Sequence, residues 1–306
     1  MPGPAPDTNS AVGPACYRDT VEENAPVARG QGAAPIVARW LGRIAYRDAW
    51  ALQRALVAAR QEDEIPDQLL LLEHDPVITL GRHAGETHVV APAALLAERG
   101  IEILRVERGG EVTYHGPGQL VAYPIVTLAA RRLGVRPFVE ALEGAMADAC
   151  AAAGVAAGPR DGHPGCWCDS GGSLSRKIGA LGIRVSRGVT FHGIALNVTT
   201  DLADFGLIDP CGMPGLTSTS IARERGDGAA RPSTASVAAA AADFARALAQ
   251  RLGARLEGSL PPAADPVAER AALGAIGQDE MAGGRAAAPA AAPHPTAPAA
   301  AAGGGG

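Results

Sequence analysis

The spacing of apolar residues along the chain predicts four helices. One apolar stripe with helical spacing covers residues 46–60. Residues 92–99 and 136–153 show the same signal, and each has a proline at or near its first turn, where a missing N–H is tolerated. Residues 237–252 predict an alanine-rich helix after a Ser/Thr cluster.

Strand signals lie between these helices. Short apolar or alternating runs predict strands, separated by glycine-rich breaks, over 69–72, 101–106, 111–114 and 119–126. A further pair, Lys177 to Val185 and Val189 to Val198, alternates well and is joined by a three-residue turn, which predicts a β-hairpin. Helices mixed with antiparallel strand pairs predict an α+β fold, a mixed and largely antiparallel sheet flanked by helices.

The two ends of the chain differ from its middle. Residues 1–35 and 259–306 are rich in Pro, Gly and Ala and show no periodicity, so we expect disordered tails there. Residues 36–258 are then expected to form one compact domain. The tails also hold part of the alanine excess, which reaches 65 of the 306 residues.

Composition limits the function classes. A net charge of −5 without a dense basic stripe argues against a nucleic-acid partner. No apolar run is long enough to span a membrane, and the N-terminus lacks the apolar core of a secretory signal. Five cysteines at scattered spacings do not form a disulfide framework. We therefore expect a cytoplasmic protein that binds neither nucleic acid nor membranes.

Residues 108–119 form the densest group of special residues. Four glycines, Arg108 and His115 lie within twelve positions. The glycines allow the backbone to come close to a bound group, and the histidine can donate a hydrogen bond or move a proton. A strand follows the glycines, which excludes a dinucleotide-binding motif, and no Gly-Lys-Ser/Thr follows, which excludes a phosphate loop. A binding loop and a plain tight hairpin with a solvated histidine both fit this composition.

Two single residues are candidates for catalysis. Cys211 lies between Pro210 and Gly212, in a rigid turn unlike a core, and a nucleophilic thiol needs a partner that stabilises its thiolate. Lys177 is the only lysine beside 26 arginines. Lysine can lose its proton or act as a compact ammonium, as arginine cannot, which suits a general base or a thiolate partner. An inert buried thiol and chance survival of one lysine are the alternatives.

The remaining cysteines and histidines give weaker signals. The tight Cys166-x-Cys168 spacing without a second pair argues against a metal site and favours packing, and Cys150 is expected in the core. His83 follows a strand end and could line a pocket. His192, on an alternating strand, is expected to form structural hydrogen bonds rather than to act in catalysis.

Four segments of the chain resemble the ordered motifs of lipoyl(octanoyl) transferases, and the match runs from about Trp40 to Leu252. They are residues 108–119, 177–185, 191–197, and 210–215 followed by Thr217-Ser218. The resemblance implies the fold of biotin and lipoate protein ligases. It also implies a cysteine–lysine dyad, Cys211 and Lys177, and an acyl pocket formed by Arg108, Gly109, Gly110, Glu111, Val112, Thr113, Tyr114, His115, Ala180, Leu181, Gly182, Gly193, Ile194 and Ala195. Small residues on the hairpin would leave room for a saturated C8 chain.

The resemblance implies octanoyl transfer to a lysine of a lipoyl domain, in protein lipoylation. The implied donor is octanoyl-acyl carrier protein, and the implied acceptors are lipoyl domains of 2-oxoacid dehydrogenase complexes and the glycine cleavage H protein. Because amide formation from a thioester runs downhill, no ATP, other cofactor or metal is expected. An ATP-dependent lipoate or biotin protein ligase and a non-catalytic acyl-binding protein on the same fold remain the alternatives.

Overall fold

The computed structural model describes residues 34–261, except 170, 173, 210–216 and 227–235. Most of both expected tails, and Cys16 and Cys211, lie outside the described residues. The expected domain limits, 36 and 258, fall one residue inside the first and last strands, which begin at Pro35 and end at Ser259.

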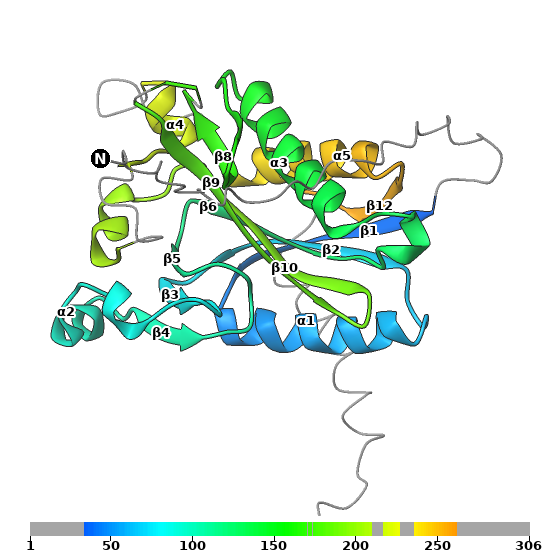
Figure 1. Ribbon diagram of the computed structural model, residues 1–306, viewed down its shortest axis with the longest axis horizontal. Coiled ribbons are helices and arrows are strands. Elements are labelled where there is room, and N and C mark those ends of the chain that lie inside the picture. The colour runs from blue at the N-terminus through cyan, green and yellow to red at the C-terminus, as the bar shows by residue number, and fades with distance from the viewer. Residues whose placement is uncertain (1–33, 170, 173, 210–216, 227–235, 262–306) are drawn as a thin grey trace, which may run out of the picture. The chain divides into compact units, whose positions relative to one another are not determined.

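The main sheet has nine strands in the described part of the chain (Figure 1). In spatial order they are β12 (Arg255–Ser259), β1 (Pro35–Ile44), β2 (Asp67–His74), β6 (Gln119–Ile125), β10 (Val189–Asn197), β9 (Arg176–Ser186), β8 (His163–Cys168) and β7 (Gly158–Arg160), with β11 (Thr217–Ser218) beside β9. Three pairs, β1–β12, β1–β2 and β9–β11, are parallel, and the others are antiparallel. The predicted mixed, largely antiparallel sheet is confirmed.

A smaller sheet and the helices complete the described fold. The small sheet has the order β4 (Glu102–Arg105), β3 (Val77–Leu80) and β5 (Val112–His115). The helices are α1 (Tyr46–Gln61), α2 (Ala93–Glu98), α3 (Val135–Ala152), α4 (Ile221–Glu224) and α5 (Val237–Arg251), with short 3-10 turns η1 (Glu86–His88), η2 (Ala129–Arg131) and η3 (Leu202–Leu207). All four predicted helices are present within two residues of their expected ends.

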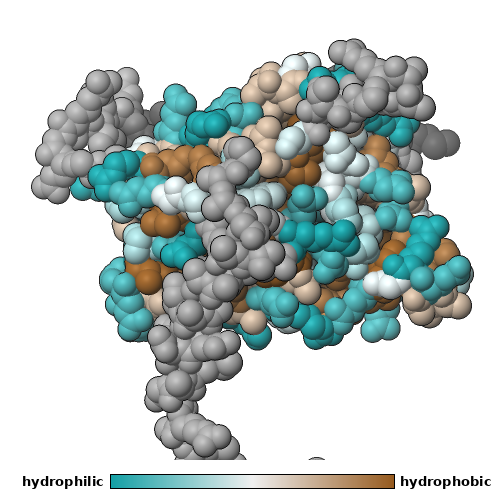
Figure 2. Space-filling model, turned by 180° about the vertical axis from the view of Figure 1, so that it is seen from behind, coloured by the Kyte–Doolittle hydropathy of each residue, from teal (hydrophilic) through white to brown (hydrophobic). Residues whose placement is uncertain are grey.

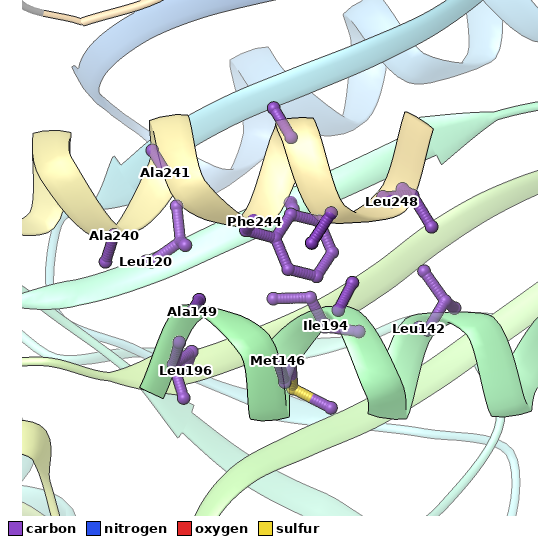
Figure 3. Packing of buried hydrophobic residues seen from close by; sticks show 14 of the residues in the cluster. Leu120, Leu142, Met146, Ala149, Ile194, Leu196, Ala240, Ala241, Phe244 and Leu248 are labelled. Atoms are coloured by element: carbon purple, nitrogen blue, oxygen red, sulfur yellow. The ribbon is translucent and has the colours of Figure 1, made fainter. Parts of the chain in front are cut away.

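Helices α3 and α5 pack on one face of the main sheet and on each other (Figure 3). Phe244 of α5 is fully buried between them, together with Leu142 and Met146 of α3. Alanines on both helices, including Ala145 and Ala241, are also fully buried. Small side chains allow the two helix backbones to approach closely, so part of the alanine excess is core material.

Helix α1 covers the opposite face of the sheet. Alternation along β2 divides its leucines, with Leu69 and Leu71 under α3 and α5 and Leu70 and Leu72 under α1. A strand buried on both faces has a continuous run of apolar residues. In β2 this run is residues 69–72, and it is the part of the strand that the sequence predicted. At the start of β2, Asp67 forms buried ion pairs with Arg60 and Arg131 at 2.7 and 2.6 Å.

The predicted hairpin is confirmed as β9–β10, with Val189 opposite Ser186 and Leu196 opposite Gly179. Hydrophilic residues cover most of the described surface seen in Figure 2, and hydrophobic residues lie in smaller groups between them. In the described residues, no helix combines the length and the apolar character that a membrane crossing needs.

Candidate active site

A cavity of about 100 Å³ lies between the β9–β10 hairpin and the segment after β4. The described chain contains sixteen candidate site residues, and thirteen of them line this cavity. Residues from the separate motifs therefore meet in space. They are Arg108, Gly110, Glu111, Val112, Thr113, His115, Lys177, Ala180, Leu181, Gly182, Gly193, Ile194 and Ala195.

The other candidates lie outside the cavity lining. Alternation along β5 turns Tyr114 away from Thr113 and His115, and its hydroxyl donates to Asp204 at 2.5 Å. Gly109 acts through its backbone, whose N–H donates to the Ile183 carbonyl at 3.1 Å and so joins the loop to the hairpin. His83 is exposed and is not among the residues that line this cavity.

Arg108 is a buried cation in the cavity wall, with 7% of its surface exposed. Its guanidinium donates to the Thr79 hydroxyl and carbonyl, at 2.9 and 2.7 Å, and to the Gly109 carbonyl at 3.0 Å. Bonds from a planar guanidinium to several acceptors fix its orientation. Arg108 therefore supplies a positive charge that is held in one place beside the cavity.

The hairpin glycines are required by protein neighbours. A Cβ on Gly182 would approach the Gly109 carbonyl to 2.7 Å, and a Cβ on Gly193 would collide with the Ala122 carbonyl of β6. These two positions therefore let backbone segments close around the cavity, rather than leaving open space for a chain as the sequence suggested.

Buried polar side chains at the cavity wall form two hydrogen-bonded chains. His74 donates from Nδ1 to the Ile44 carbonyl at 2.9 Å and accepts from the Tyr123 hydroxyl at 2.7 Å. His115 donates from Nδ1 to the Gln119 amide oxygen at 2.7 Å, and Gln119 donates to Asn197 at 2.9 Å. The first chain had no signal in the sequence, because its residues occupy ordinary strand positions.

Burial keeps these histidines neutral. It lowers the pKa of His74 to about 4, and it lowers the pKa of His115 well below 6.5, where the positive charge of Arg108 acts in the same direction. Because Nδ1 of His115 carries its proton toward Gln119, Nε2 is the acceptor nitrogen of that ring. The residue therefore presents a neutral acceptor at neutral pH.

His192 corrects the expectation that it forms structural hydrogen bonds. Its ring lines the cavity, yet neither ring nitrogen has a hydrogen-bond partner among the described residues. Its backbone has a φ of 54°, and its N–H donates to the Gln53 side chain at 2.8 Å instead of to β6. Burial and the charge of Arg108 lower the pKa of His192 to about 3.

Lys177 lies near the start of β9, at another part of the cavity. Its Nζ lies 5.2 Å from the centre of the Trp167 ring, and its carbonyl accepts from the Thr219 N–H at 2.9 Å. Ser218 of β11 is opposite it in the sheet. Next to it, Arg176 forms a two-bond ion pair with Glu224, at 2.8 and 2.9 Å, which fixes α4 beside this strand.

The described cysteines are core residues, as expected. Cys150, Cys166 and Cys168 are buried in the cluster beneath α3 and α5. Burial raises the pKa of the Cys168 thiol to about 12, and a hydrogen bond with Cys166 together with burial raises that of Cys150. A thiol held in its protonated form is a poor nucleophile.

Comparisons with known proteins agree with this arrangement. The catalytic domain of lipoyl protein ligases A and B matches residues 45–247. An octanoyltransferase of Acidobacterium capsulatum is 50% identical over 192 residues, which cover 60% of this chain and 78% of that protein. An octanoyltransferase of Desulfotalea psychrophila is 46% identical over 187 residues, which cover 61% of this chain and 82% of that protein.

Solved structures support the same fold. A crystal structure of lipoate-protein ligase A bound with ATP matches with a TM-score of 0.57 and 12% identity, over 80% of this chain and 94% of that one. A putative lipoate protein ligase from T. acidophilum with bound lipoic acid matches with a TM-score of 0.55 and 15% identity, over 81% and 95%. At this identity the likeness shows the fold alone. The chain belongs to the lipoyl protein ligase A/B catalytic-domain family and, within it, to the octanoyltransferases.

Proposed function

We propose that this protein transfers an octanoyl group from octanoyl-acyl carrier protein to a lysine of lipoyl domains, through a thioester on Cys211. One observation carries this proposal. Lys177 lines the cavity that the acyl-pocket motifs enclose, and β11, which pairs with Lys177, begins six residues after Cys211. The acceptors are the lipoyl domains of 2-oxoacid dehydrogenase complexes and the glycine cleavage H protein.

Elimination supports Cys211 as the nucleophile. The three described cysteines are buried in the core, which leaves Cys211 and Cys16. Cys211 belongs to a segment whose two flanks are described and hydrogen-bonded. On one side, the Asp209 N–H donates to the His88 carbonyl at 2.8 Å, and on the other, β11 pairs with β9.

The reaction has two steps. Lys177 takes the proton of the Cys211 thiol, and the thiolate sulfur attacks the carbonyl carbon of the carrier thioester. The C–S bond to the carrier breaks, and the carrier sulfur takes that proton from Lys177 and leaves as a thiol, so Lys177 is neutral again. The neutral amine of the incoming lysine then attacks the new thioester. A C–N bond forms, the bond to the Cys211 sulfur breaks, and Lys177 accepts the proton that the amine loses.

Mass spectrometry of the intact protein tests the intermediate. After mixing with octanoyl-carrier and without ATP, we expect one octanoyl adduct, which peptide mapping assigns to Cys211. Cys211→Ala should abolish it, whereas the matched variant Cys16→Ala should retain it. An adduct on another residue would disprove the assignment, and a requirement for ATP would favour a ligase that activates a free acid.

Lys177→Arg separates charge from proton chemistry. Arginine keeps the positive charge but cannot act as a base. We expect transfer to the acceptor to fall by about 10²–10⁴, the usual contribution of a general base, and near-normal turnover would show that only the charge is used. Arg176→Lys, at the neighbouring strand position, is the control for general changes in this strand.

A further inference from the structure

The cavity has one polar wall that the proposed reaction does not use. Its members are His192, Tyr123 and Tyr46, which come from β10, β6 and α1 and all line the cavity. His192 is 1% exposed, and its Nε2 is 4.0 Å from a carboxylate oxygen of Glu107, too far for a hydrogen bond. Both ring nitrogens therefore lack partners among the described residues.

The backbone of His192 brings its ring to this place. Strict alternation would place residue 192 on the side of Ile194, under α3 and α5. Instead φ is 54°, the N–H bonds to Gln53 of α1, and the ring stacks on Phe191 at 4.9 Å and meets Tyr123 edge-on at 6.4 Å. A left-handed backbone costs energy for a residue with a Cβ, so the fold holds this ring at the cavity.

Strand register gives the distance from the reacting end. Lys177 and Ile183 are six residues apart on β9, and Ile183 is opposite His192. At about 3.4 Å per residue, this separation is roughly 20 Å. An extended octanoyl group, with seven C–C bonds of about 1.5 Å, spans roughly 9 Å. An octanoyl group whose carbonyl carbon lies beside Lys177 therefore ends before His192, and each further pair of methylenes brings the chain end about 2.5 Å closer to the ring.

We propose that the His192 wall limits the length of the acyl chain that the cavity accepts. A longer hydrocarbon chain would bring its terminal methylenes against the ring nitrogens of His192. Hydrocarbon keeps water from these nitrogens and cannot hydrogen-bond to them, which costs free energy. His192 is thus a specificity-determining residue for the acyl group, an inference that rests on the proposed octanoyl transfer.

Two nearly isosteric variants test the polarity of this wall. His192→Leu removes the polar group at this position, whereas His192→Asn keeps one. Both variants retain a Cβ on the same backbone. Transfer is measured with octanoyl- and dodecanoyl-carrier. We expect His192→Leu to raise the dodecanoyl-to-octanoyl ratio of kcat/KM at least tenfold, and His192→Asn to change it less than about threefold. His192→Gly suits the left-handed backbone and should also raise the ratio, so a fold defect in the leucine variant leaves the test intact.

Binding of octanoate and dodecanoate, measured by calorimetry on the same proteins, separates this inference from the proposed function. If wild-type protein transfers no octanoyl group, the proposed function fails, and the binding ratio still tests the wall. If transfer is normal but neither ratio changes in His192→Leu and His192→Gly, the inference fails alone. An equal shift in the leucine and asparagine variants also overturns it, because side-chain volume would then set the limit.

Discussion

Beneath α3 and α5, the main sheet is covered by Phe244, Leu142, Met146 and many alanines (Figure 3). On the α1 side it also buries His74, Tyr123 and Gln119, next to His115 of the small sheet. The first face is stabilised by apolar area, which is non-directional and shared among many residues. The second depends on hydrogen bonds, each with a defined partner. His115, Gln119 and Tyr123 of the second group line the cavity, so the geometry of the site depends on those hydrogen bonds.

Phe244→Ala should give the largest loss of stability. Deleting a fully buried phenylalanine removes transfer free energy and leaves a cavity, at a cost of about 3–5 kcal/mol. The free energy of unfolding in urea measures this loss. Because Phe244 does not line the cavity, transfer per folded molecule should stay near the wild-type value at low temperature. A large fall in kcat without unfolding would show that the two faces are coupled.

Gln119→Leu should affect both stability and activity. It removes the amide that accepts from His115 and donates to Asn197, and it leaves those buried groups unsatisfied, at about 1–3 kcal/mol. We also expect kcat/KM to fall at least tenfold, because His115 loses its fixed orientation. Met146→Leu, a near-isosteric change beneath α3, is the control and should cost less than about 1.5 kcal/mol without changing kcat/KM.

The buried histidines should make stability fall in mild acid. His74 has its pKa lowered to about 4 in the folded protein, against about 6.5 when unfolded, so the unfolded chain binds the extra proton between these values. Its contribution is complete above pH 6.5 and is lost as the pH falls toward 4, at up to roughly 1.4 kcal/mol per pH unit. Unfolding curves across this range should show a smaller slope for His74→Gln, and an unchanged slope would contradict the assignment.

Asp148→Asn should have the smallest effect. Asp148 pairs with Arg251 at 2.7 Å across the α3–α5 interface, but both side chains are solvent-exposed. Exposed pairs contribute about 0–1 kcal/mol. Thermal unfolding in low and high salt should therefore barely distinguish the variant from wild type. A loss of several kcal/mol would mean that charge, rather than apolar packing, stabilises this face.

The sequence predicted those elements whose pattern is local. Helices and the β9–β10 hairpin show their own periodicity, and each was found within two residues of its ends. Strands β1, β3 and β12 were not predicted. β3 is only four residues long and fully buried, and β12 is a largely exposed edge strand. Parallel partners such as β1 and β12 are also far apart in the chain, so no turn signals their pairing.

Part of the site followed from motifs, and part needed the fold. The motif segments meet at the cavity as the resemblance implied, with Lys177 at its wall. Tyr46 and Tyr123 were missed because a tyrosine in a helix or strand is most often simple core. The role of His192 depends on a positive φ, which the residue type alone does not predict.

The pairing of β12 with β1 has a consequence for synthesis of the chain. Residues 255–259 complete a sheet edge that begins at residue 35, so more than two hundred residues must be translated between the two partners. At about 5–20 residues per second, β1 waits roughly 10–40 s for β12 on a ribosome. During that time one edge of β1 is open to other strands. A nascent chain stalled before residue 255 should therefore associate with neighbouring chains more readily than the released full-length chain.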